Sequence, residues 1–335
     1  MNVCFFVRLK SSVKTESDKI FNSVEFYNND IKILKKAGFK VDYCYNLSGL
    51  LKKKYDLYYI WWYGYGVFPA AIAFLLNKPS IVIGNIHTVN GQGLSSWPFY
   101  KKNLMKLCMK LASKSFFTSK KEIERLGKFK PRSSDILYNC VNPTLYKPNE
   151  KDIKEKVILT ISNLTKENVK RKMILESLHA FKLFQNYSKK YTYIICGRKG
   201  DGLELINEKI QSLGLLNEVK IIGDIPINKK ITLLNTCSLY LQPSLAEGFG
   251  VSILEAQSCG APVLTSYEPC INEIFGESVL RAEGAHDLCE KMNYILTNND
   301  IYEKYVNLGF VNSKKYSFKI REEKIKSTIK SLLKL

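Results

Sequence analysis

Short apolar runs alternate with longer amphipathic stretches along the whole chain. The runs have the length and the β-branched and aromatic content of strands, and the stretches between them, such as 19–37 and 99–112, have helical spacing. Predicted strands are 2–7, 40–45, 57–61, 80–86, 115–118, 135–137, and then 156–161, 192–196, 219–222, 239–242 and 261–265. Continuously apolar strands separated by helices indicate parallel sheets covered on both faces. Two successive sets predict an α/β protein with two doubly wound, Rossmann-like domains.

The polar, proline-marked stretch 142–150 separates the two sets of elements. We therefore expect a first domain at 1–148 and a second at 149–317. The basic amphipathic helix at 318–335 is expected to pack back on the first domain. Because ligands of open α/β sheets bind beyond the carboxyl ends of the strands, two such domains facing a cleft predict an active site in that cleft.

Charge is strongly positive and unevenly distributed. The chain has 335 residues, 45% of them hydrophobic, which suffices for two cores and excludes global disorder. Its net charge is +20, and residues 1–150 carry 24 basic against 10 acidic side chains. A basic half indicates an anionic partner, although lysine-rich composition alone gives the same balance. No recognisable nucleic-acid module accompanies the charge, so nucleic acid is disfavoured as a partner.

Cysteine spacing and hydropathy predict a cytoplasmic protein. The nine cysteines form no C-x-x-C pair, which is typical of reduced thiols in the cytosol. The chain starts with a short strand-like run and lacks the features of a signal peptide. No run reaches the roughly 18 apolar residues that a membrane span needs, and the nearest, 67–76, predicts a core helix.

The helix at 99–114 leaves two interpretations open. Lys102, Lys106, Lys110 and Lys114 lie on one helical stripe. The apolar residues that lie largely on another are Leu104, Leu107, Cys108 and Leu111. Such a helix can lie on anionic lipid, which would place the protein on the inner face of the membrane. Equally, it can pack its apolar stripe on the core and leave the lysines in water.

The stretch 239–265 is the one that points to chemistry. A strand ends at 242, and a loop with glycines at 248 and 250 leads into a helix from about 251. Glycines let a ligand approach the backbone, and a helix N-terminus suits a diphosphate. Glu247 in the loop and Glu255 in the helix can accept hydrogen bonds from sugar hydroxyls. Taken without further comparison, an ordinary strand–turn–helix with two surface glutamates fits equally well.

This stretch resembles the donor-site signature of family 4 glycosyltransferases, the Glu-x7-Glu retaining enzymes of the GT-B fold. The matching positions are Pro243, Ser244, Glu247, Gly248, Phe249, Gly250, Glu255, Ala256, Gly260, Pro262 and Val263. The resemblance implies that Glu247 contacts the donor sugar and that Glu255 binds the ribose hydroxyls. It also implies donor contacts from Ser244 and Gly248 and from the amides of Phe249, Gly250 and Val251.

Residues 157–181 resemble the same family's strand–loop–helix that meets the diphosphate. Lys172 takes the position of the family's lysine. Asn163 stands where an arginine is common, and Arg171 is the candidate to supply the missing charge. A fixed cation beside a helix N-terminus stabilises a departing diphosphate without a metal. Further donor contacts are expected at Gly197, Arg198 and Gly223, which follow two strands of the second set.

The first half holds the weaker matches. His87 ends a buried strand where the family often has a histidine near the reacting carbon, although a strand-end histidine is more commonly structural. The family's glycine-rich loop after the first strand is missing here, and Arg8, Lys10 and Ser11 are the acceptor-side candidates in its place.

The resemblance implies a retaining glycosyltransferase that moves a sugar from a nucleoside-diphosphate sugar to a hydroxyl. The expected acceptor is a glycan or a lipid-linked glycan, in the synthesis of cell-surface polysaccharide such as lipopolysaccharide. No Asp-x-Asp pair occurs, so neither a metal nor another cofactor is expected. The alternatives are a phosphorylase-type enzyme or a relative that binds sugar nucleotides without transferring the sugar.

Overall fold

The computed structural model describes residues 1–8, 21, 24–51, 54–86, 97–149 and 151–334. These divide into two compact units. The first comprises the described residues up to Cys140 together with those from Phe318 onward, and the second runs from Val141 to Ser317. The second unit starts earlier than the expected residue 149. Val141 pairs with Ser317, and its amide donates to the Tyr316 carbonyl at 3.1 Å.

The first unit is built on a six-stranded sheet in the order β2-β1-β3-β4-β5-β6, with every neighbouring pair parallel. Its strands are β1 (Asn2–Val7), β2 (Lys40–Cys44), β3 (Leu57–Trp61), β4 (Ser80–Gly84), β5 (Lys114–Phe117) and β6 (Ser134–Ile136). Its helices are α2 (Glu25–Lys36), α3 (Leu47–Leu51), α4 (Val67–Leu75), α5 (Phe99–Leu111), α6 (Lys120–Glu124) and α15 (Phe318–Leu333). The strand order reverses between β1 and β3, which makes that point the crevice of this sheet.

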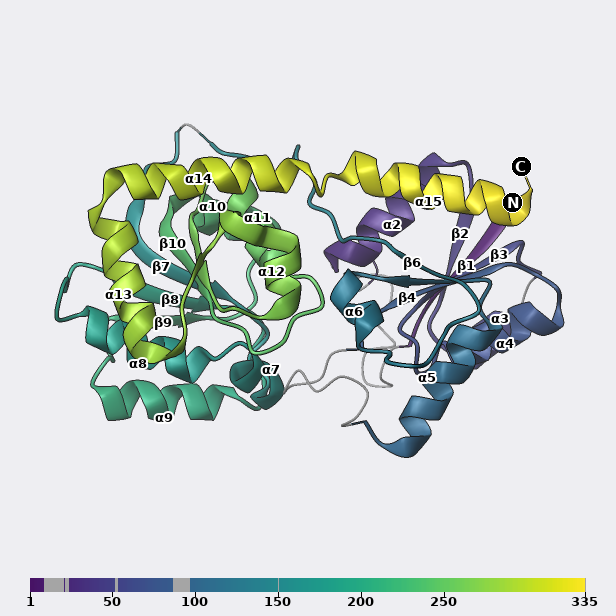
Figure 1. Ribbon diagram of the computed structural model, residues 1–335, viewed down its shortest axis with the longest axis horizontal. Helices are drawn as coiled ribbons and strands as arrows, with labels where there is room; N and C mark the ends of the chain where they lie inside the picture. Colours follow the sequence, from purple (N-terminus) through teal and green to yellow (C-terminus); the bar gives the residue numbers. More distant parts are fainter. Residues whose placement is uncertain (9–20, 22–23, 52–53, 87–96, 150, 335) are drawn as a thin grey trace. The chain divides into compact units, whose positions relative to one another are not determined.

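Alternate residues of β1 enter two different cores. Val3 and Phe5 pack with α2 and α15, whereas Cys4 and Phe6 pack with α4 and α5. The sheet is therefore covered on both faces, as the apolar strands predicted (Figure 1).

The last helix is fixed to the first unit by a buried arginine. Arg321 on α15 is 3% exposed, and its Nε and Nη2 lie 2.7 and 2.9 Å from the two oxygens of the buried Asp30. Its Nη1 donates to the carbonyls of Leu137 and Tyr138. This arrangement explains why the end of the chain folds with its beginning.

One expectation for this unit is wrong in part, and α5 buries only part of its expected apolar stripe. The stretch 67–76 was expected to be a core helix, but α4 buries only its small-residue side, and Leu75 is 81% exposed. On α5 the buried residues are Met105, Cys108 and Met109, and Leu104 and Leu107 face solvent. We call the exposed apolar set of these helices the α4–α5 apolar surface. It consists of Phe68, Phe74, Leu75, Leu76, Phe99, Tyr100, Leu104 and Leu107.

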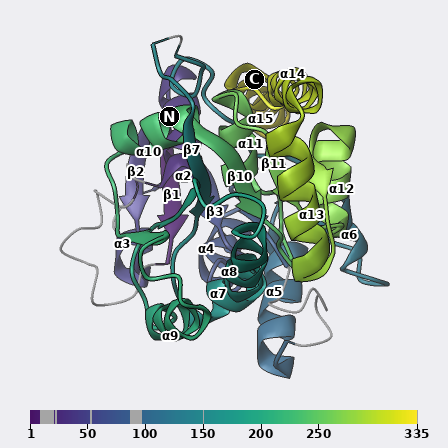
Figure 2. The same ribbon diagram turned by 90° about the vertical axis from the view of Figure 1, so that its left-hand side faces the viewer.

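The second unit has its own six-stranded parallel sheet, in the order β12-β11-β10-β7-β8-β9. Its strands are β7 (Glu155–Ile161), β8 (Thr192–Cys196), β9 (Val219–Ile222), β10 (Cys237–Gln242), β11 (Val263–Thr265) and β12 (Leu280–Arg281). The two-residue β12 was not predicted, because it is too short to give a periodic pattern. Strands β7, β10 and β11 run side by side (Figure 2).

Helices cover both faces of this sheet as well (Figure 1). They are α7 (Lys166–Arg171), α8 (Ile174–Phe184), α9 (Leu203–Leu213), α10 (Ile227–Thr236), α11 (Val251–Ser258), α12 (Pro269–Phe275), α13 (Gly284–Thr297) and α14 (Asn299–Lys314). One core packs α8, α9 and α13 against the sheet. Across both units, no helix in the described residues is long and apolar enough to cross a membrane.

Candidate functional site

The strand order of the second sheet reverses between β7 and β10, so its crevice lies beyond the carboxyl ends of those two strands. Strand β7 leads into the loop before α7, and β10 ends at Gln242. The segments that follow carry Lys172 and Glu247. The two motifs singled out in the sequence therefore come from the two strands that border one crevice.

Glu247 is the anion at this crevice. Its side chain is nearly buried, and the residue is 7% exposed. Its Oε1 lies 3.0 Å from Arg171 Nη1 and 3.6 Å from Lys172 Nζ. The same oxygen accepts hydrogen bonds from Ser244 Oγ at 2.9 Å and from Gln242 Nε2 at 3.1 Å. One carboxylate and two cations thus meet in a site that excludes most water.

Backbone geometry places both cations. Helix α7 ends at Arg171, and Met173 then adopts a left-handed conformation (φ 50°) before α8 begins. Such a conformation costs a non-glycine residue about 1–3 kcal/mol. Arg171 Nη1 donates to the Ala246 carbonyl at 2.7 Å, and the Leu245 amide donates to the Arg171 carbonyl at 2.7 Å. The loop after β7 is therefore tied directly to the loop after β10.

Gln242 joins these groups and was missed in the sequence. It is fully buried, and its Oε1 accepts from Lys172 Nζ at 2.9 Å and from Ser252 Oγ at 2.8 Å. Its Nε2 donates to Glu247, so one amide holds a cation and an anion at once. The sequence could have pointed to Gln242, because a glutamine at the end of a buried apolar strand needs polar partners.

Burial of the ammonium group lowers the pKa of Lys172 to about 8, and the Glu247 carboxylate opposes that shift. Desolvation disfavours the charged form of a lysine, while a neighbouring carboxylate favours it. The side chain is therefore a cation that loses its proton near pH 8. An anion bound beside the ammonium group would raise the pKa of Lys172 again.

The turn into α11 requires glycine and leaves its first amides without a side-chain cap. Gly250 has φ +92°, and a Cβ there would lie 3.0 Å from the Phe275 ring. The Phe249 ring packs against Phe275 and Tyr316, so any contact of Phe249 with a ligand would come from its backbone. Gly248 is also buried, and Val251 opens the helix. A helix start of this kind suits an anion.

Glu255 has a partner that the sequence did not reveal. Glu255 is 3% exposed, and Lys230 Nζ on α10 lies 2.6 Å from its Oε1. Lys230 Nζ is also 3.1 Å from the Tyr146 hydroxyl and 5.2 Å from the centre of that ring. Glu255 lies one turn into α11, and Lys230 reaches it from α10.

The remaining donor-side candidates lie at strand ends but are less enclosed. Asn163 and Arg198 are exposed, and the loops that carry them are joined by the Leu164 amide, which donates to the Arg198 carbonyl at 2.9 Å. Gly197 has φ +141°, and a Cβ there would lie 2.0 Å from the Ser162 carbonyl oxygen, so the position requires glycine. Gly223 follows β9 directly.

In the first unit, Arg8 follows β1 at the crevice of that sheet. It is exposed, and its guanidinium lies 5.1 Å from the centre of the exposed Tyr65 ring. Lys10, Ser11 and His87 lie outside the described residues, so their predicted roles stay predictions.

Two doubly wound parallel sheets, each with helices on both faces, define the GT-B class of fold. A family model described as glycosyl transferases group 1 matches residues 142–310, half of the 335-residue chain. The chain belongs to this family.

Relatives match only part of their own length. A segment of 153 residues, 44% of this chain, is 29% identical to the serotype-specific mannosyltransferase WbdA of Escherichia coli and spans 19% of that protein. The O-antigen chain mannosyltransferase RfbU of Salmonella typhimurium is 25% identical over 184 residues, 54% of this chain and 49% of RfbU. The crystal structure of HepE from Anabaena in complex with UDP and glucose matches 99% of this chain and 100% of its own, with a TM-score of 0.77 and 18% identity. That structural likeness shows the fold.

Proposed function

We propose that the chain is a retaining, metal-independent glycosyltransferase. It moves a hexose from a nucleoside-diphosphate sugar to a hydroxyl of a glycan or lipid-linked acceptor, in the synthesis of a cell-surface polysaccharide. Family membership supports transfer of a sugar. The mannosyltransferase relatives support an O-antigen-like product, and HepE, whose crystal structure contains UDP and glucose, supports a nucleotide-sugar donor.

The observation that carries the proposal is the meeting of Glu247, Arg171 and Lys172 at the crevice of the second sheet. A diphosphate brings two or more negative charges, and two nearly buried cations match them in a region of low dielectric. Glu247 accepts hydrogen bonds from the sugar hydroxyls, because hydrogen bonds from Ser244 and Gln242 fix the orientation of its carboxylate. The α11 N-terminus adds backbone donors at the same place.

Catalysis then depends on stabilising the leaving group. As the bond from the sugar carbon to the diphosphate breaks, negative charge grows on the phosphate oxygen, and fixed cations stabilise that charge without reorganising. We infer that this oxygen takes the proton of the incoming hydroxyl on the same face of the sugar. Retention of configuration follows, and no side-chain base is required.

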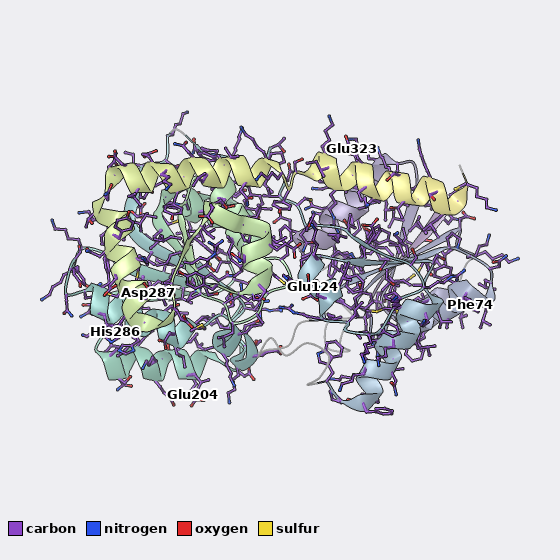
Figure 3. The ribbon with its side chains drawn as sticks, viewed as in Figure 1. Phe74, Glu124, Glu204, His286, Asp287 and Glu323 are labelled. Carbon is purple, nitrogen blue, oxygen red and sulfur yellow. The ribbon has the colours of Figure 1, made fainter. Side chains whose placement is uncertain are left out.

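We also propose that the α4–α5 apolar surface binds an anionic membrane. Phe74 lies on α4 (Figure 3). The exposed Leu104 and Leu107 lie on α5, which also carries Lys106 and Lys110. Apolar side chains that enter the headgroup region and lysines that meet anionic lipid are the two contributions that hold peripheral proteins. This placement would bring the enzyme to a lipid-linked acceptor.

A thermal-shift panel tests the donor site. UDP-, GDP- and ADP-sugars are added in EDTA, and a ligand at a hundredfold excess over its Kd should stabilise the fold by about 2.7 kcal/mol. That corresponds to a rise of roughly 5–10 °C in Tm. At the same ligand concentration the rise should fall to about half in Glu255→Ala, because a tenfold weaker Kd leaves about 1.4 kcal/mol of stabilisation. If no sugar nucleotide shifts the Tm, the proposal fails. If a sugar nucleotide shifts the Tm only when a metal is added, the metal-independent part of the proposal fails.

Transfer and membrane binding are tested separately. Anomeric configuration of the product, read by NMR, should match that of the donor, and inversion would refute the retaining mechanism.

Membrane binding is tested by sedimentation with vesicles. Vesicles of phosphatidylglycerol should sediment the protein, and vesicles of pure phosphatidylcholine should not. The double variant Leu104→Gln/Leu107→Gln should lose sedimentation, while Leu216→Gln, 70% exposed in the second unit, should keep it. Equal sedimentation of all variants would remove the α4–α5 apolar surface as the membrane contact.

A further inference from the structure

A cation stands beside the carboxylate that we assign to the donor's ribose. Lys230 Nζ lies 2.6 Å from Glu255 Oε1, and Glu255 is almost completely buried. A carboxylate this buried is costly to keep ionised unless a positive group pairs with it. Lys230 supplies the opposite charge next to this buried carboxylate.

Three segments fix the position of this lysine. Lys230 belongs to α10 and pairs with Glu255 on α11, while the ring and hydroxyl of Tyr146 hold it from the segment before β7. In the part of the chain that the structure describes, Oε1 of Glu255 takes the ion pair and Oε2 takes no hydrogen bond. The pair thus leaves one carboxylate oxygen for an incoming hydroxyl.

The pair also lies close to the carboxyl end of β8. Burial raises the pKa of the Cys196 thiol to about 11, and the positive charge of Lys230 opposes that rise. Cys196 is the last residue of β8 and precedes Gly197. Lys230 is therefore near both the helix that carries Glu255 and a strand end at which the donor nucleotide is expected.

We propose that Lys230 is a positioning residue of the donor site, which holds Glu255 ionised and oriented so that Oε2 accepts hydrogen bonds from the ribose hydroxyls of a nucleoside diphosphate. The inference rests on the proposed function, in which the second unit binds the donor. Its consequence is specific: the preference for ribose over deoxyribose depends on Lys230.

Isothermal titration calorimetry on the full chain tests this consequence. The probes are UDP, GDP and ADP and the 2′-deoxy form of each, in EDTA. The wild-type protein should bind its preferred parent nucleotide more tightly than the deoxy form by about tenfold, since a hydrogen bond to a charged group is worth a factor of roughly ten or more. Lys230→Met should weaken the parent by about tenfold and bring the ratio of the two Kd values close to one.

Two further variants separate positioning from structure. Lys230→Arg keeps the charge beside Glu255 and should retain the ratio. Lys229→Met removes one charge from the neighbouring exposed position of α10 and should change neither Kd. Lys230→Gln serves if the methionine variant does not fold, because it keeps a hydrogen-bond donor and loses the charge.

A double-mutant cycle completes the test. In Glu255→Gln the ribose preference should already be lost, so adding Lys230→Met should have little further effect. Independent, additive losses would overturn the inference, as would tighter binding in Lys230→Met, which would mean that the lysine only competes with the ribose. If no parent nucleotide binds wild-type protein, the proposed function itself fails. If a parent binds and the ratio survives Lys230→Met, only the role of Lys230 fails.

Discussion

Replacement of Gln242 by leucine should change the pH range in which the proposed donor site binds a nucleoside diphosphate. The side chain is fully buried, and its Oε1 accepts a hydrogen bond of 2.9 Å from Lys172 Nζ. Leucine fills a similar volume but accepts nothing. The protonated ammonium loses a partner, whereas the neutral amine loses less, so the change disfavours the charged form.

The magnitude follows from the structure. Leaving a buried group without its hydrogen bond costs about 1–3 kcal/mol, and one pKa unit corresponds to about 1.36 kcal/mol. Burial already lowers the pKa of Lys172 to about 8. In Gln242→Leu we therefore expect that pKa to fall by roughly one to two units, toward about 6–7. A diphosphate binds the protonated lysine, so the alkaline loss of affinity should move down the pH scale by the same amount.

Calorimetric Kd values for the preferred nucleoside diphosphate, taken from about pH 5.5 to about pH 9 at constant ionic strength, measure this shift. Near pH 8 the variant should bind far more weakly than wild type, and near pH 5.5 the two should approach each other. Gln257→Leu is the matched control, since Gln257 is a buried glutamine that bonds to Ser278 and Asn312 instead. An equal loss at every pH, or an unmoved alkaline limb, would refute the reasoning.

Three further outcomes are expected. Arg321→Met leaves Asp30 charged and unpaired in the core, so urea unfolding should show a loss of about 3–5 kcal/mol, against less than about 1 kcal/mol for the half-exposed Lys324→Met. Gly250→Ala forces a side chain into a left-handed conformation against a ring, so calorimetry and urea unfolding should show weaker nucleotide binding and a loss of about 1–3 kcal/mol. Glu247→Gln should reduce the transfer rate by about a hundredfold or more while nucleoside diphosphate still binds, and a normal rate would remove Glu247 from the mechanism.

The strands could be predicted because a parallel sheet covered on both faces leaves a simple record in the sequence. Asn2–Val7 and Leu57–Trp61 have the predicted bounds, since each is a continuous apolar run between polar residues. The position of the crevice could be predicted from the same pattern, because the segments that follow two parallel strands of one sheet both begin at its carboxyl-end edge. Glu247 and Lys172 are 75 positions apart and still meet at 3.6 Å.

Pairings between helices could not be predicted in this way. Lys230 is one of 51 basic residues, and nothing in its surroundings in the sequence distinguishes it from a solvated lysine. Its role depends on how α10 packs beside α11, which periodicity does not encode. The same limit explains α5, where the buried stripe is Met105, Cys108 and Met109, although Leu104 and Leu107 are equally apolar.

The buried Lys172 at the proposed donor site lowers the stability of the folded chain. The folded-state pKa of Lys172 is about 8, below the ordinary value of 10.5, so the folded chain holds this proton less firmly than the unfolded chain. Below about pH 8 the protonated lysine costs the fold on the order of 3 kcal/mol, and the cost fades as pH rises from about 8 toward 10.5. An anionic diphosphate beside Lys172 acts in the opposite direction, since it raises this pKa and restores the lost stability. Under the proposed function, donor binding and protonation of Lys172 are therefore linked, and the burial that makes the lysine costly would also strengthen the effect of its charge on the departing phosphate.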